Sequence, residues 1–239
     1  MNPVTGHSVT GDSNTGQALT SALAAWENWN SLGFKTRSER LSAALSKQTL
    51  PREAQKLLQL LLERAARLEK IHELPGPTGE CNELYLNGRG VAVVHGTDQS
   101  HQVAFLGQLI TALVCGNCVL VSLPSQTDWC ESICKQLHAA GISQAVLQHH
   151  PALNTYSLSQ LEEISLVAPV CTEEELITLN RQLAERNGLL VQLIPETDPI
   201  GCTHLLQPDH MLRFVTEKTR SINTTAVGGN ATLLELGNG

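Results

Sequence analysis

Short continuous runs of apolar residues, separated by helical stretches, are the feature of this sequence that most constrains its fold. The runs lie at 91–94, 119–121, 145–147, 164–167 and 189–193, and helices are expected between them at about 101–115, 127–140 and 172–187. Strands of a parallel sheet read as unbroken apolar runs because helices cover both faces of the sheet. The sequence therefore predicts an α/β fold, a doubly wound parallel sheet with right-handed crossovers.

Three helices are expected ahead of this sheet. An arm without periodicity at 1–15 precedes apolar residues at helical spacing over 17–33, then a helix carrying Leu41 and Leu45, then a helix at about 52–71. Residues 74–79, Leu-Pro-Gly-Pro-Thr-Gly, cannot continue a helix, because proline lacks an amide donor and glycine favours open conformations.

These patterns divide the chain into three parts. We place an N-terminal arm and helical layer at 1–73, the α/β domain at 74–210 and a strand-like tail at 211–239. Within the α/β domain, the helix at 172–187 has the clearest end signals. Thr172 is a suitable N-cap, and Glu174 and Glu175 lie in the first turn.

Composition excludes several classes of protein. A net charge of −7 and a pI near 5.7 offer no basic surface for nucleic acid. No run of about 18 apolar residues is present, which argues against a membrane span. The polar residues at 1–16 argue against a signal peptide. We therefore expect a globular, cytoplasmic protein, and the opening at Met1 favours a natural start.

The seven cysteines are interpreted mainly as reduced, buried thiols, because several lie in apolar surroundings. Cys115 and Cys118 form a C-x-x-C, and Cys130 and Cys134 follow at about the separation of a second zinc knuckle, so a regulatory zinc module is an alternative. However, Cys130 and Cys134 fall one turn apart in an expected helix. We assign no metal ligand.

Two polar clusters suggest chemistry that their spacing does not support. His149 and His150 are adjacent, so on a strand they point to opposite sides, and we interpret them as a solvated loop. Asp98, Ser100 and His101 are close in sequence, whereas a hydrolytic triad is assembled from separate elements. We expect Ser100 to cap the helix that begins at His101.

Several passages resemble the aldehyde dehydrogenase superfamily and, within it, the proline utilization A family. Residues 90–94 (GVAVV), 113–117 (LVCGN) and 124–126 (PSQ) resemble the cofactor half of the superfamily. Residues 74–82 and 213–231 look like the C-terminal region of the long, trifunctional enzymes, which couple proline dehydrogenase to L-glutamate γ-semialdehyde dehydrogenase. The resemblance implies a Rossmann-like, aldehyde-dehydrogenase-type domain, followed by a motif implicated in association and in covering the internal channel.

The catalytic parts that this family needs are not apparent in the sequence. The nucleophilic cysteine of the family lies in a glycine-flanked loop of a separate catalytic domain, and no such loop is found here. Leu123 and Gln126 replace the lysine and glutamate that hold the adenosine ribose in the family pattern, and the loop at 95–100 lacks its aromatic segment. We assign no catalytic residue and no cofactor-binding residue, and expect NAD binding to be weak or absent.

The tail carries the expected association site. Its polar, strand-like residues have too little apolar surface to form a core, so the tail must pack on its own domain or, as the resemblance implies, on another subunit or a partner. The residues assigned to this association tail are Arg220, Ile222, Asn223, Thr224, Thr225, Gly228, Gly229 and Asn230.

We therefore expect a non-catalytic domain of a proline catabolism enzyme. It would act in oligomer assembly or in covering the substrate channel of L-glutamate γ-semialdehyde dehydrogenase, with itself, a proline dehydrogenase or a semialdehyde dehydrogenase domain as partner. The alternative is an NAD-dependent L-glutamate γ-semialdehyde (1-pyrroline-5-carboxylate) dehydrogenase that uses an unrecognised site.

Overall fold

The central sheet has five parallel strands. The structure, a computed structural model, describes residues 12–224. The strands are β3 (Val91–Gly96), β4 (Cys118–Ser122), β5 (Leu147–His149), β6 (Leu166–Val170) and β7 (Gln192–Leu193), in the order β5-β4-β3-β6-β7. Every pair in this sheet is parallel. The predicted doubly wound α/β fold is confirmed. The chain adds β4 and β5 on one side of β3 and then β6 and β7 on the other side, so the strand order reverses between β3 and β6.

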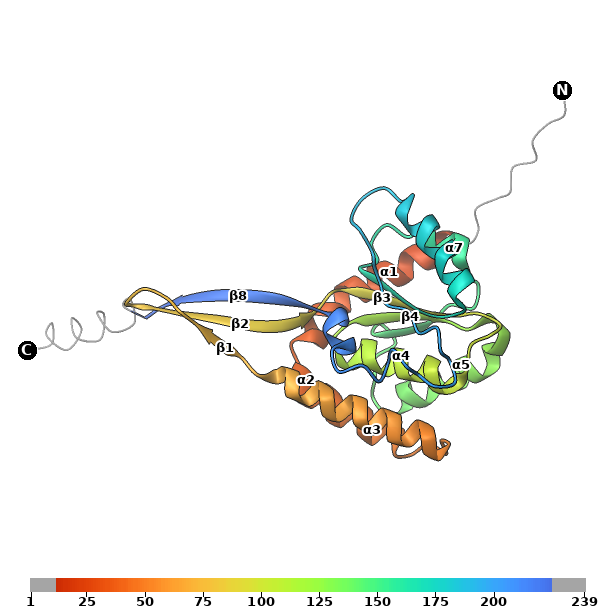
Figure 1. Cartoon of the computed structure of the whole chain (residues 1–239), viewed down its shortest axis with the longest axis horizontal. Helices are drawn as coiled ribbons and strands as arrows, with labels where there is room; N and C mark the ends of the chain where they lie inside the picture. Colours follow the sequence, from red (N-terminus) through yellow and green to blue (C-terminus); the bar gives the residue numbers. More distant parts are fainter. Residues whose placement is uncertain (1–11, 225–239) are drawn as a thin grey trace, which may run out of the picture.

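Helices cover both faces of this sheet (Figure 1). They are α4 (Gln102–Val114), α5 (Thr127–Ala139), α6 (Thr155–Ser159) and α7 (Glu173–Ala184), with 3-10 turns η2 (Pro124–Gln126) and η3 (His210–Phe214). In the view of Figure 1, α4 and α5 lie below the sheet and α7 above it. The short helix α6 was not expected from the sequence. No helix within residues 12–224 is long and apolar enough to cross a membrane.

The three predicted N-terminal helices are present as α1 (Asp12–Asn30), α2 (Gly33–Leu45) and α3 (Arg52–Ala66). Two boundaries differ from expectation. The helix α1 begins at Asp12, inside the segment that was expected to be an arm. The helix α3 ends at Ala66 and continues as the 3-10 turn η1 (Arg67–Glu69). The helix α1 contacts β3 and β4, whereas α2 and α3 pack on the outer side of α4.

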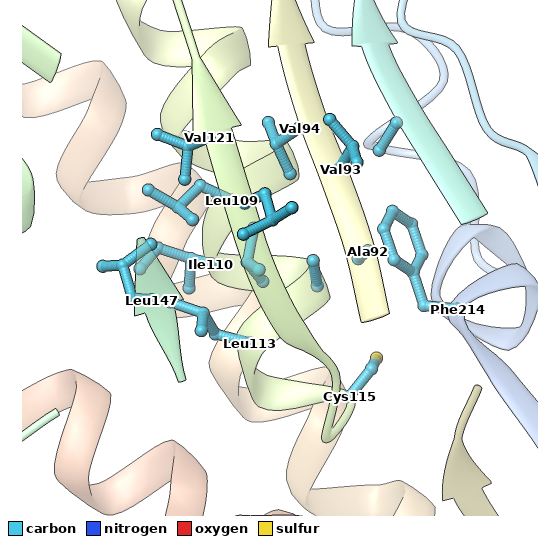
Figure 2. Packing of buried hydrophobic residues seen from close by; sticks show 14 of the residues in the cluster. Ala92, Val93, Val94, Leu109, Ile110, Leu113, Cys115, Val121, Leu147 and Phe214 are labelled. Atoms are coloured by element: carbon cyan, nitrogen blue, oxygen red, sulfur yellow. The ribbon is translucent and has the colours of Figure 1, made fainter. Parts of the chain in front are cut away.

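The core is built from aliphatic side chains, as the low aromatic content requires. Figure 2 shows Val93 and Val94 of β3, Val121 of β4, and Leu109 and Ile110 of α4 as members of one buried cluster. These five side chains are at most 1% exposed. Burying one such side chain contributes roughly 1.5–3 kcal/mol. The helix α4 is the centre of this packing, because every residue from Ala104 to Val114 is buried.

A second sheet projects from this body (Figure 1). It consists of β1 (His72–Leu74), β2 (Glu80–Gly88) and β8 (Val215–Asn223), antiparallel in the order β1-β2-β8. We call it the projecting sheet. The strands β2 and β8 pair over nine positions, from Glu80 opposite Asn223 to Gly88 opposite Val215.

Only part of the projecting sheet was expected from the sequence. The strands β1 and β2 were not expected. Of the predicted break at 74–79, Leu74 ends β1 and residues 75–79 connect β1 to β2. The strand-like segment expected from Arg220 belongs to β8, which begins earlier, at Val215, and ends at Asn223. Only Val215 in β8 and Gly88 in β2 are buried, so neither strand shows the alternation of buried and exposed residues that marks a half-buried strand.

The predicted apolar strand at 189–193 is only partly correct. The strand β7 contains just Gln192 and Leu193, while Leu189 and Leu190 precede it in an exposed loop at 87% and 93% exposure. This apolar run lies at the edge of the sheet, where fewer neighbouring elements cover it. Its leucines are therefore exposed although the run reads as a strand.

One side chain joins the projecting sheet to the body. Asn117, which is fully buried, accepts hydrogen bonds at Oδ1 from the backbone N–H groups of Arg89 (2.8 Å) and Gly90 (3.2 Å). Its Nδ2 donates to the carbonyl oxygens of Ala112 and Phe214, each at 3.1 Å. The side-chain amide of Asn117 thus connects the end of α4, the turn between β2 and β3, and the segment that precedes β8.

The backbone is also closely packed at this junction. Gly116 has φ +89°, a value that favours glycine, and a Cβ at Gly88 would lie 2.5 Å from the carbonyl carbon of Gly116. Beside it, the buried guanidinium of Arg37 donates to the carbonyl oxygens of Val114 (2.8 Å) and Asn30. Desolvation by burial lowers the pKa of Arg37 to about 10, so the group remains charged at neutral pH.

Replacing Asn117 with alanine should therefore destabilise the protein strongly. The backbone N–H groups of Arg89 and Gly90 and the Phe214 carbonyl oxygen lose their side-chain partner, whereas the Ala112 carbonyl keeps the backbone N–H of Asn117. We expect a loss of about 3–5 kcal/mol in the free energy of unfolding. Urea denaturation followed by circular dichroism would measure it. Asn180→Ala, on the exposed surface of α7, is the matched control and should cost less than about 1 kcal/mol. A loss for Asn117→Ala as small as that of the control would contradict the proposed junction.

Candidate functional site

The carboxyl ends of β3 and β6 frame a small pocket. In doubly wound sheets, ligands bind outside the carboxyl ends of the strands, at the point where the strand order reverses. Here that point lies between β3 and β6, and a pocket of about 240 Å³ opens there against α7. Its lining includes His95, Thr97, Cys171, Glu174, Glu175 and Gln182.

The first turn of α7 closes one side of the pocket. The predicted N-cap is confirmed: the Thr172 hydroxyl accepts a hydrogen bond from the backbone N–H of Glu175 (3.3 Å). The Glu175 carboxylate in turn accepts from the backbone N–H of Thr172 (2.8 Å) and from the hydroxyl of Thr97 (3.0 Å). A phosphate group bound at the N-terminus of α7 would compete with the Glu175 carboxylate for these hydrogen-bond donors. The three glutamates of this turn, Glu173 to Glu175, also give it negative charge.

His95 forms the floor of the pocket at the end of β3. Its side chain is buried, with the residue 4% exposed, and its Nδ1 has no hydrogen-bond partner within the described part of the chain. Burial lowers the pKa of His95 to about 4, an effect that the nearby Glu175 carboxylate opposes. His95 is therefore neutral at physiological pH.

Leu123 and Gln126, the two positions that differ from the family pattern for ribose binding, are occupied by contacts within the chain. Leu123 is fully buried, and it lies so close to Gly96 that a Cβ there would overlap it. Gln126 accepts from Gln102 Nε2 (2.6 Å) and donates to the Ser100 carbonyl oxygen (3.4 Å).

The structure does not bring Asp98, Ser100 and His101 together as a triad. The Ser100 hydroxyl donates to the carbonyl oxygen of Val170 (2.6 Å) and accepts from the backbone N–H of Thr97 (2.7 Å). The expected capping role of Ser100 is wrong. His101 is the N-cap of α4, and its Nδ1 accepts from the backbone N–H of Val103 (3.4 Å). Ser100 instead fixes the loop after β3 to the end of β6.

The cysteines within residues 12–224 are free thiols, and all but Cys81 are buried. Burial raises the pKa of Cys115, Cys118 and Cys171 to about 12 each. Cys130 hydrogen-bonds to Cys134 one helical turn away, which raises the pKa of Cys130 further. No three His, Cys, Asp or Glu side chains in this part of the chain are arranged to hold a metal ion.

The adjacent histidines are less solvated than expected. His149 ends β5 and His150 follows it, and both are half-buried. The backbone N–H of His150 donates to the carbonyl oxygen of Val121 (2.9 Å), which attaches this segment to β4. Burial lowers the pKa of both imidazoles, so the interpretation as a solvated loop is wrong.

The predicted association tail is described only as far as Thr224. Arg220, Ile222 and Asn223 lie in β8, and Thr224 follows that strand. Thr225, Gly228, Gly229 and Asn230 lie outside the described residues. Up to this point the tail pairs with β2 of its own chain, an interaction in cis.

Comparison with solved structures identifies the fold. The chain is similar to a variant of Bradyrhizobium japonicum proline utilization A, with 26% sequence identity, a TM-score of 0.67 and 80% of this chain covered. The fold is that of the aldehyde dehydrogenase superfamily. Proline utilization A from Bdellovibrio bacteriovorus (17% identity, TM-score 0.68) and Thermus thermophilus 1-pyrroline-5-carboxylate dehydrogenase (16%, TM-score 0.66) share this fold, each over 77% of this chain.

The match covers only part of the larger enzymes. This chain spans 22% of the length of the two proline utilization A chains and 42% of the 1-pyrroline-5-carboxylate dehydrogenase. No protein family model matches the sequence, and no curated protein matches it. The predicted resemblance to an aldehyde-dehydrogenase-type domain of proline utilization A is thus supported by structure, at low sequence identity.

Gln182, a polar residue of the pocket, was not expected from the sequence. Gln182 lies in the last two turns of α7, and its Oε1 is buried without a hydrogen-bond partner in the described structure. Nothing in the local pattern distinguishes it from an ordinary polar residue of an amphipathic helix. Only the packing of α7 beside β6 brings it to the same pocket as His95.

The low pKa of His95 predicts a pH dependence of stability. In the unfolded chain the imidazole takes up a proton near its ordinary pKa of 6.5, whereas the folded protein resists protonation until about pH 4. Stability is therefore complete above about pH 6.5 and is lost as the pH falls from 6.5 toward 4, by about 2 kcal/mol from this group at pH 4.5. The measurement is urea unfolding at pH 7.5 and pH 4.5. His95→Phe should reduce the difference between the two pH values.

Leu179→Ala, in the wall of the same pocket, is the control for this experiment. It removes buried apolar surface but no titrating group, so it should lower stability and leave the pH difference as in the unmodified chain. If His95→Phe leaves the pH difference unchanged, His95 is not held neutral by burial.

Proposed function

We propose that this chain is a non-catalytic, aldehyde-dehydrogenase-like domain of a proline catabolism enzyme. It assembles with another subunit, or covers the substrate channel of L-glutamate γ-semialdehyde dehydrogenase, through its projecting sheet. Association with such a dehydrogenase would place this chain in the cytoplasm. The observation that carries the proposal is the long edge of β8.

The strand β8 pairs with β2 along one edge only. Its other edge, from Val215 to Ile222, pairs with no strand of residues 12–224. An edge of this length presents a row of backbone donors and acceptors that a strand from another chain can pair with. The projecting sheet also lies away from the body over most of its length, so such a partner would meet little steric hindrance.

The base of the projecting sheet is fixed against the body. Lys218 Nζ lies 5.6 Å from the centroid of the Trp26 ring on α1, and Arg89 Nε donates to the carbonyl oxygen of Arg213 (2.8 Å). Arg213 in turn donates to the Leu193 carbonyl oxygen (2.6 Å). A sheet held at one end by the core can present its far end in a defined direction.

The far half of the projecting sheet offers a mixed surface. Arg220 pairs with Glu83, and its guanidinium carbon lies 5.5 Å from the centroid of the Tyr85 ring. Ile222, opposite Cys81 on β2, is 42% exposed. Arginine and tyrosine are common in protein interfaces, and an exposed isoleucine beside them gains from being covered.

The environment of the thiols supports a non-catalytic role. An aldehyde dehydrogenase requires a reactive thiolate, and thiolates form where nearby positive charge lowers the pKa. Cys115, Cys118 and Cys171 have raised pKa values instead. The acidic first turn of α7 and the buried Leu123 in place of a lysine disfavour a dinucleotide as well.

Enzymatic assays separate this proposal from the alternative of an active dehydrogenase. The purified chain should produce no NADH above background from NAD and L-glutamate γ-semialdehyde, measured by absorbance. Calorimetry should show an NAD dissociation constant weaker than about 1 mM, because charge-assisted bonds to the ribose and phosphates are missing. Turnover that is lost on alkylating the thiols, or submillimolar NAD binding, would overturn the non-catalytic assignment.

Association through β8 predicts a change in assembly mass when its far end is altered. Ile222→Lys introduces a charge on the exposed far end of the sheet, and light scattering should report a smaller species, alone or with the partner dehydrogenase. Leu190→Lys makes the same kind of change on the body, at a residue that is 93% exposed, and should leave the mass unaltered.

A truncation complements these substitutions. Ending the chain after Thr224 leaves β8 complete, whereas a cut after Leu212 would also remove the buried Phe214 and Val215 and damage the fold. We expect the cut after Thr224 to weaken assembly, because it removes the rest of the predicted association tail, including Thr225, Gly228, Gly229 and Asn230. If Ile222→Lys and this truncation both leave the mass unchanged, association through the projecting sheet is refuted.

A further inference from the structure

The direction of the backbone groups along β8 is fixed by its pairing with β2. Just past the end of β8, the backbone N–H of Thr224 donates to the Gly79 carbonyl oxygen on the β2 side (2.8 Å). The backbone groups of an antiparallel strand point to alternate sides, so those of Thr219 and Ser221 face the open edge, which pairs with no strand of residues 12–224. The residues between them would form non-hydrogen-bonded pairs with an added strand, in which side chains approach most closely.

The charges of β8 are divided between its two faces. Lys218, Arg220 and Ile222 lie on one face, because side chains alternate along a strand, and Glu217 lies on the other. Arg220 pairs with Glu83 on β2. Like charges directly opposite each other on paired strands are destabilising. The charges therefore restrict which strands can pair with this edge.

This restriction applies to a second copy of β8. In a two-fold antiparallel pair, opposite residues share a face, so the axis passes through a residue of the strand. Pairing about five residues or more, a common strand length, requires an axis between Glu217 and Ser221. An axis through Glu217, Lys218 or Arg220 places that residue opposite its own copy, and an axis through Thr219 places Lys218 opposite Arg220. Only the axis through Ser221 brings no like charges opposite each other.

We propose that two copies of this chain associate through the far half of β8, antiparallel about a two-fold axis at Ser221. This inference rests on the proposed assembly through the projecting sheet and names a second copy as the partner. Ile222 of each copy lies opposite Arg220 of the other, where its apolar side chain packs along the arginine stem. The Arg220 charge stays with Glu83 of its own chain.

The shape of the molecule permits this contact. The projecting sheet extends away from the body, so an antiparallel pairing of two far ends keeps the two bodies at opposite ends of the assembly (Figure 1). The two three-stranded sheets would join through β8 into one continuous sheet. The paired segment is short, so we expect a dimer that depends on concentration.

The first test is disulfide cross-linking of the whole chain under mild oxidation. Ser221→Cys places two thiols opposite each other across the axis, with Cα atoms about 5.5 Å apart, a separation that a disulfide spans. Thr219→Cys, on the same face, is the matched control, because in this pairing it lies opposite Asn223 and not its own copy. Non-reducing gels should show at least about tenfold more covalent dimer for Ser221→Cys than for Thr219→Cys or the unmodified chain.

The second test is sedimentation equilibrium with substitutions at Ile222. The unmodified chain should form a dimer as its concentration rises. Ile222→Lys places a cation opposite Arg220 of the other copy and should weaken the dimer at least about tenfold, whereas Ile222→Glu places a carboxylate there and should not weaken it.

The outcomes separate this proposal from the assembly role on which it rests. Equal cross-linking by the two cysteine variants, or a dimer weakened equally by lysine and glutamate, would overturn the pairing about Ser221. A chain that stays monomeric alone but binds a semialdehyde dehydrogenase through Ile222 would overturn the second copy as partner and leave the proposed function intact. If Ile222→Lys alters neither the dimer nor such a complex, the proposed association through β8 fails as well.

Discussion

The hydrogen bonds of the Asn117 amide are the interaction on which both sheets depend. The end of α4, the turn between β2 and β3, and the entry to β8 all meet this side chain. The residues involved are far apart in sequence, and the carbonyl groups at the end of a helix have no partner within the helix. Gly116 and Gly88 allow the backbones to approach closely enough for one short side chain to reach all of them. The projecting sheet is therefore an extension of the core and not a loosely attached hairpin.

The pocket between β3, β6 and α7 follows from the frame of the doubly wound sheet. The strands and the first turn of α7 still frame a pocket, because their positions follow from the packing of β3 and β6 against buried helices. The charge within that frame depends on a few side chains. Glu175 lines the pocket and accepts hydrogen bonds from the backbone N–H of Thr172 and from the hydroxyl of Thr97. A few side chains thus set the charge of the pocket without disturbing the sheet that forms it.

The parts of the fold that could be predicted from the sequence are those where burial leaves a periodic pattern. The strands β3 and β4 and the helices α4 and α5 lie within two residues of their predicted bounds, because the apolar runs are buried on both sides. The strand β2 could not be recognised, since polar residues such as Asn82, Glu83 and Asn87 occupy a strand with only one buried position. In the pocket, the Thr172 cap followed from local chemistry, whereas Gln182 depends on a contact between distant elements. Ser100 was misassigned because its hydroxyl binds Val170, seventy positions away, and not its own helix.

The charges on β8 are consistent with an edge that accepts one partner and resists others. A long exposed edge is a risk for unspecific pairing, and natural sheets reduce it with charged side chains. Glu217, Lys218 and Arg220 follow this rule, and Arg220 already has a carboxylate partner in Glu83 on β2. A second strand must then match these charges as well as the backbone pattern, because an unmatched charge at the contact costs free energy. Since Asn117 and Lys218 hold the base of the sheet against the body, a partner meets an edge that is already ordered, and less conformational entropy is lost on association.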